Sequence, residues 1–81
     1  MTKEELRNLI DDGHEIEFEA EGKRYSITYG IVKGEEVISF CEFYKETTEV
    51  KTVDELCQIK RDGHTVLELL ANLTENDILI Y

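Results

Sequence analysis

The strongest constraint on the fold is the segment EIEFEAEGKRYSITYGI at residues 15–31, in which apolar and polar residues alternate on both sides of a glycine. Strict alternation puts every second side chain on the same face, so each half is typical of a half-buried β-strand. Glu21 and Gly22 supply the turn, because glycine accepts the positive φ that a two-residue hairpin turn requires. The sequence therefore predicts a β-hairpin.

The two-residue turn also determines which residues of this hairpin stand opposite each other. One face then pairs apolar side chains with each other, and the other face pairs opposite charges, as cross-strand neighbours prefer. The predicted pairs are Ile16 with Ile27, Phe18 with Tyr25, Ala20 with Lys23, and Glu19 with Arg24.

Three capping-box patterns, each a threonine followed three residues later by a glutamate, predict the starts of three helices. They begin at Thr2, Thr52 and Thr65. The predicted helices cover about 3–12, about 53–61 and about 66–73. Gly13 and Gly63 are predicted to have positive φ and to end the first two helices, because glycine is favoured directly after a helix.

The remaining segments complete an α+β domain. A second turn is predicted at residues 33–35, a strand with two apolar faces at 36–44, a connection at 45–51 and a short buried strand at 78–81. The order is α-β-β-β-α-α-β, with a mainly antiparallel sheet of three to four strands and helices packed on one face. We expect one domain over residues 1–81, and the edge that the last strand joins is left open.

The charge balance restricts the partners of the chain. Nine Lys and Arg residues stand against 19 Asp and Glu residues, which gives a net charge of −10. Direct binding to nucleic acid or to anionic membranes is disfavoured by this charge, whereas a basic protein is a suitable partner. The amino-terminal segment has no apolar stretch typical of a signal peptide, so we expect a cytoplasmic protein with Cys41 and Cys57 as free thiols.

Several segments resemble a family of small, acidic, uncharacterised bacterial proteins. The segments are EIEFEAEGKRYSI, SFCEFYKE, VDELCQIKRDGHTVLELL and the terminal ILIY. The resemblance covers most of the chain and rests on packing and turn residues. It implies a bacterial intracellular α+β domain, and it assigns no catalytic residue and no cofactor.

The tripeptide Asp-Gly-His occurs twice, at residues 12–14 and 62–64, and includes both histidines of the chain. Two His and two Asp side chains form a metal-ligand set if they converge. Neither segment has the helical spacing of a chelating pair, and the cysteines are single rather than closely spaced as in zinc sites. We interpret the repeat as two helix stop signals and expect no metal, no cofactor and no catalytic residue.

Two surfaces are candidates for binding a partner. Glu15, Glu17, Glu19 and Glu21 form an acidic stripe on the polar face of the first strand. The helix at about 66–73 is apolar over most of its circumference, so Leu67 and Ala71 are available for contact with another chain unless the helix is deeply buried.

From these features we expect a non-enzymatic protein-interaction module that is a monomer or a homodimer. A narrower hypothesis is an antitoxin-like protein that imitates nucleic acid, since alternate strand residues lie about 6.6–6.8 Å apart. Phosphates along one DNA strand recur on a similar scale. The competing hypothesis is a metal-dependent enzyme that uses the two Asp-Gly-His segments.

Overall fold

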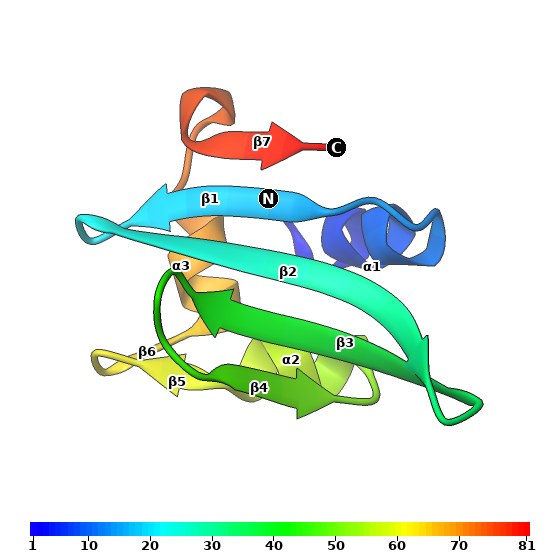
Figure 1. Ribbon diagram of the computed structural model, residues 1–81. Helices are drawn as coiled ribbons and strands as arrows, with labels where there is room; N and C mark the ends of the chain where they lie inside the picture. Colours follow the sequence, from blue (N-terminus) through cyan, green and yellow to red (C-terminus); the bar gives the residue numbers. More distant parts are fainter.

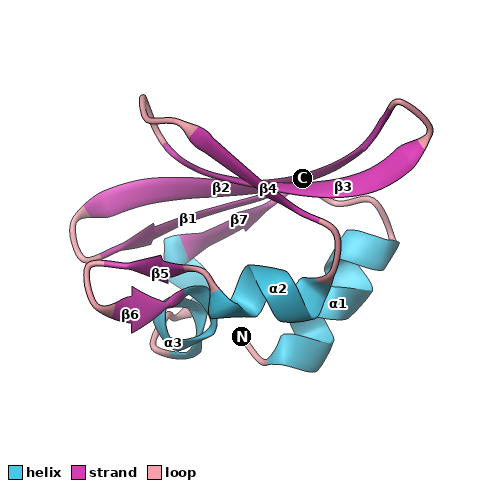
Figure 2. Ribbon diagram, turned by 90° about the horizontal axis from the view of Figure 1, so that it is seen from below, coloured by secondary structure: helices cyan, strands magenta, loops and turns pink.

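The computed structural model describes residues 1–81 and has the predicted α+β fold, with all the helices on one side of a sheet (Figures 1 and 2). The elements are α1 (Lys3–Asp11), β1 (Ile16–Ala20), β2 (Lys23–Val32), β3 (Glu35–Glu42), β4 (Thr47–Val50), α2 (Val53–Gln58), β5 (Lys60–Arg61), β6 (His64–Thr65), α3 (Val66–Ala71), the 3₁₀ helix η1 (Glu75–Asp77) and β7 (Ile78–Ile80). None of the helices is long and apolar enough to cross a membrane.

The main sheet has five strands in the order β4-β3-β2-β1-β7, and every neighbouring pair is antiparallel. Strands β5 and β6 form a separate short hairpin. In Figure 2, α1, α2 and α3 lie on one side of the sheet, and no helix lies on the other side. The sheet therefore has one covered face, one open face, and edges formed by β4 and β7.

The predicted hairpin has the predicted register. In the structure Phe18 pairs with Tyr25 and Glu19 with Arg24. Glu21 and Gly22 both have positive φ, 52° and 74°, as the two central residues of a type I′ turn require. On the covered face, the rings of Phe18 and Tyr25 stack with their centroids 5.2 Å apart.

The core lies between the covered face and the helices. It is a cluster of 15 buried hydrophobic residues, and each of the three α-helices contributes to it. In β3, Ile38 and Phe40 face this core, which resolves the two-sided apolar pattern of that strand. Phe40 is fully buried and stacks on Tyr25.

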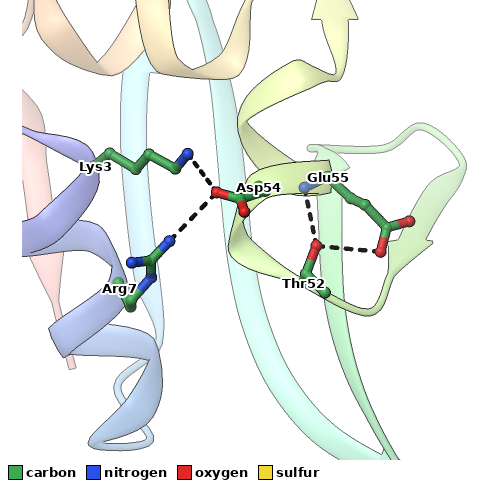
Figure 3. Close-up of polar contacts among 5 residues, drawn as sticks. All are labelled: Lys3, Arg7, Thr52, Asp54 and Glu55. Carbon is green, nitrogen blue, oxygen red and sulfur yellow. Dashed lines mark hydrogen bonds and ion pairs between the residues drawn. The ribbon is translucent and has the colours of Figure 1, made fainter.

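The predicted helix starts are confirmed. The side chains of Thr2, Thr52 and Thr65 each accept a hydrogen bond from the backbone N–H three residues later. Figure 3 shows the start of α2, where Asp54 also binds Lys3 and Arg7 of α1. This contact joins two helices of the same layer.

The prediction that residues 45–51 are only a connection is wrong. Thr47–Val50 form β4, which pairs with β3 and gives the sheet one strand more than expected. The four residues, Thr47 to Val50, show little apolar alternation, so their sequence alone does not predict a strand. The strand forms because its backbone pairs with the free edge of β3. Its partly buried side chains are Thr48 and Val50.

The prediction that Gly63 ends a helix is wrong, although its positive φ of 83° is confirmed. Helix α2 ends at Gln58, because Ile59 is already extended. Asp62 and Gly63 then form the turn of the β5–β6 hairpin, with positive φ at both positions. Gly13 has a φ of 80° and does follow a helix, so the two glycines share a conformation but not a role.

The carboxy-terminal strand is at an edge and is not buried. Strand β7 pairs with β1 on one side only, which leaves Leu79 46% and Ile80 49% exposed. Helix α3 ends at Ala71, two residues before the predicted Leu73.

Candidate protein-binding face

The open face of the sheet carries mainly polar side chains. Figure 2 shows that no helix covers this side, and the residues that alternate with the core positions of each strand belong to it. Across β1 to β4 they are Glu17, Glu19, Arg24, Ser26, Thr28, Val37, Ser39, Cys41, Thr47 and Glu49.

Three of the four predicted stripe residues form a continuous acidic row. Glu17 and Glu19 lie on the open face of β1, and Glu15 continues the same alternation directly before the strand. Glu21 does not continue it, because that residue turns into the hairpin with a φ of 52°. We call Glu15, Glu17 and Glu19 the acidic row.

No basic side chain of the protein forms an ion pair with the acidic row. Arg24 stands opposite Glu19, as predicted, but its guanidinium lies over the Phe43 ring, 5.7 Å from the centroid. Lys23 is turned to Asp62, with Nζ 2.6 Å from the carboxylate oxygen. Lys23 is therefore paired elsewhere, whereas Arg24 stays beside the row and lines a small cavity with Glu17 and Glu19 without forming an ion pair.

The acidic row borders exposed apolar groups of the carboxy-terminal strand. Leu79 pairs with Glu17, so both side chains lie on the open face. Tyr81 is 61% exposed, and the neighbouring Glu17 carboxylate raises the pKa of Tyr81. The acidic row therefore lies beside two exposed side chains with apolar surface, Leu79 and Tyr81.

Leu67 and Ala71 of α3 lie outside this face. The buried residues of α3 are Val66, Leu69 and Leu70, so burial in the core accounts for most of the apolar circumference of the helix. Leu67 is half-buried against the core and Ala71 is exposed. Because α3 lies on the covered side of the sheet, these two residues and the acidic row do not form one surface.

The two Asp-Gly-His segments do not converge. Nδ1 of His14 is 2.8 Å from the backbone oxygen of Tyr81, beside the start of β1. His64 is near the other end of that strand, where it borders a 350 Å³ cavity together with Glu21 and Gly22. Its Nδ1 is 4.0 Å from a carboxylate oxygen of Glu68. The structure contains no group of three or more His, Cys, Asp or Glu side chains arranged for metal binding.

Sequence reasoning missed two aromatic residues beside the open face. Phe43 lies under the Arg24 guanidinium, and Tyr44 is fully exposed at the turn between β3 and β4. Tyr44 has a φ of 69°, a conformation that bulky residues rarely adopt. The polar and charged residues after Tyr44 are a turn signal that would have set these aromatics apart from the strand.

Comparisons with protein-family models, curated proteins and solved structures found no match for this chain. The resemblance to acidic bacterial proteins therefore gains no family assignment from them. The structure supports the coarser part of that resemblance, a small α+β protein.

Proposed function

We propose that the protein is a non-enzymatic binding module whose acidic row binds a basic protein partner in the bacterial cytoplasm. The observation that carries this proposal is the row itself, three carboxylates on an uncovered sheet face that form no ion pair in the molecule, with Arg24 as the one cation beside them. A Lys- or Arg-rich protein surface supplies the missing charges.

The electrostatics of the whole chain support this partner class. Alternate residues on a strand are about 6.6–6.8 Å apart, so neighbouring carboxylates in the row repel each other within one Debye length. A basic partner relieves that repulsion when it binds. The net charge of −10 also attracts a basic protein at long range and speeds its association.

A decoy for a nucleic-acid-binding protein is a narrower form of the same proposal. It is supported by the regular spacing of the carboxylates, which is on the scale of phosphates along a DNA strand. An antitoxin-like protein works in this way when it occupies the nucleic-acid site of a basic partner. In that form, nucleic acid and the acidic row compete for one surface.

The test is charge reversal in the acidic row. The partner is purified with the wild-type protein from the native cell and identified, and its affinity is then measured at low and high salt. We expect affinity to fall as salt rises, and Glu17→Lys with Glu19→Lys to abolish binding. Added nucleic acid releases the partner if the decoy form is right.

A matched control is Glu4→Lys with Asp11→Lys, which changes the net charge equally on the helix side. Glu4 lies in the first turn of α1, where the helix dipole makes a lysine unfavourable. Asp11 lies in the last turn, where the dipole makes a lysine favourable, so the two effects on helix stability offset each other. Binding by this control supports a specific site. Unchanged binding by the Glu17 and Glu19 double variant contradicts the proposal.

A homodimer through α3 is the alternative use of an apolar surface. It is less favoured because only two apolar residues of that helix, Leu67 and Ala71, remain outside the buried set. Sedimentation at several protein concentrations tests it, and a strict monomer excludes it.

A further inference from the structure

The two edges of the sheet differ in their protection. At the β4 edge, Arg61 of β5 donates a hydrogen bond to Thr48 at 2.9 Å. Charged Glu49 lies in β4, and Lys51 directly follows it. At the β7 edge, the segment 74–81 contains no Lys, Arg or Pro. Natural proteins block pairing with other chains by such residues, by a covering element or by a very short edge strand, and β7 has only the last of these, because it is three residues long.

The backbone of β7 leaves hydrogen-bonding groups free along that edge. The Tyr81 N–H donates to the Glu15 carbonyl at 2.8 Å, so residues 81 and 79 point their backbone groups toward β1. By alternation, the N–H and C=O of Ile80 point away from β1. The Ile78 N–H is already bound to the Glu75 carbonyl, while the Ile78 C=O faces the same free edge as Ile80.

A cavity lies on the helix side of this edge, and its lining includes Glu5, Thr74 and Glu75 beside four apolar residues. Its volume is 400 Å³, and Met1, Leu73, Ile78 and Ile80 line it. Ile80 is 49% exposed there. A strand added to β7 would direct every second side chain into this cavity, where apolar residues are preferred.

Negative charges outnumber positive ones around the edge, where the cations are the Met1 amino group and the Arg24 guanidinium. Glu5 and Glu75 border the cavity on the helix side, and Glu17 lies beside Leu79 on the open side. A second copy of the chain would bring two acidic rims together, which like-charge repulsion disfavours. Lys or Arg residues on the open side of an added strand would reach across Leu79 to the acidic row.

We propose that the β7 edge accepts an extended segment of the basic partner by strand addition. The segment alternates apolar residues, which enter the cavity, with Lys or Arg residues, which face the acidic row. Main-chain hydrogen bonds to Ile80 and Ile78 supply affinity, and the alternating side chains supply specificity. The partner class rests on the proposed function, whereas the mode of binding rests on the free edge.

The test uses the acetylated and amidated peptide Lys-Val-Lys-Val-Lys as a probe. Its control is Val-Val-Lys-Lys-Lys, which has the same composition and charge but no alternation. Binding is measured by titration with NMR detection of the backbone amides. We expect only the alternating peptide to slow hydrogen exchange of the Ile80 amide, by about tenfold or more at saturation.

The matched variant is Ile80→Pro, which removes the free N–H without touching the ladder to β1. Proline is tolerated on edge strands when its nitrogen faces outward, and urea unfolding checks that the variant stays folded. We expect the Ile80→Pro variant to bind the alternating peptide no more tightly than the control peptide. If this variant unfolds, the hydrogen exchange of the Ile80 amide in the wild-type protein with each peptide still tests the proposal.

The outcomes separate the two proposals. Strand addition is wrong if both peptides bind equally, if Ile80→Pro keeps the difference between them, or if the Ile80 amide is already protected by self-association. In each of these cases a loss of partner binding in the Glu17 and Glu19 double variant still supports the proposed function. Conversely, unchanged partner binding in that double variant refutes the proposed function, even where the Ile80 amide becomes protected by the alternating peptide.

Discussion

Alanine at Gly13 or Gly63 should destabilise the protein by about the same amount, although the two glycines lie in different structures. Their φ values are 80° and 83°, and a Cβ added at either position meets no atom within 4 Å. Steric overlap with the rest of the protein therefore contributes nothing. What remains is the cost of the left-handed backbone for an L-residue, about 1–2 kcal/mol at each position.

Gly30 provides the matched control. Its added Cβ also meets no atom within 4 Å, but its φ is not positive. Gly30→Ala should therefore stabilise the protein by about 0.4–1 kcal/mol, because alanine restricts the unfolded chain. The three variants make the same chemical change and differ in the sign of the expected effect.

Urea unfolding followed by far-ultraviolet circular dichroism measures these differences. A chain of 81 residues has a free energy of unfolding of about 4–12 kcal/mol. A loss of about 1–2 kcal/mol is a large part of that and should lower the melting temperature by about 4–16 °C. The slope of the free energy with urea should stay constant.

The reasoning is refuted if Gly63→Ala leaves the free energy of unfolding unchanged. That result would mean that the β5–β6 turn does not have positive φ at Gly63. A loss in Gly30→Ala as large as in the other two would show that the effect comes from the added methyl group and not from the backbone.

Three further predictions concern single side chains. Glu21→Asn should raise the free energy of unfolding by about 0.5–1 kcal/mol, because asparagine tolerates positive φ in a type I′ turn, and it should leave partner binding unchanged. A stability loss in urea contradicts the turn assignment. The hydrogen bond from Lys3 lowers the pKa of Asp54, so Asp54→Asn should be less stable than wild type above the unfolded-state pKa of about 3.9. This stabilisation is lost as pH falls through the lowered pKa of Asp54. The difference in free energy of unfolding between wild type and Asp54→Asn, measured with urea, should therefore become smaller at low pH. A difference that stays constant across pH contradicts the ion-pair explanation. Iodoacetamide should modify half-buried Cys41 in the folded protein and Cys57 only on unfolding, since burial raises the pKa of the Cys57 thiol. Mass spectrometry of both sites over time checks this, and equal rates argue against burial of Cys57.

The sequence by itself determined the features that depend on near neighbours. The helix starts at Thr2, Thr52 and Thr65 follow from side chains that bond to backbone groups three residues away. The register of the first hairpin follows from a two-residue turn and the alternation on each side of it. Positive φ at Gly13 and Gly63 follows from the freedom of glycine, whatever structure contains it.

The tertiary structure alone decided how distant segments use those local signals. Residues 47–50 become a strand because β3 offers them an edge, and Gly63 becomes a hairpin turn because the chain is already extended at Ile59. Both outcomes depend on pairing with another strand, β3 for residues 47–50 and β6 for β5, and the propensity of each segment alone does not determine that pairing.

The candidate site divides in the same way. Alternation placed Glu15, Glu17 and Glu19 on one face, because side-chain direction on a strand has a period of two. The sequence did not show that Arg24 would turn to Phe43, or that β7 would join β1 and leave its own edge free. Those choices depend on which surfaces meet when the sheet packs on its helices, and they determine whether the acidic row is left without a partner.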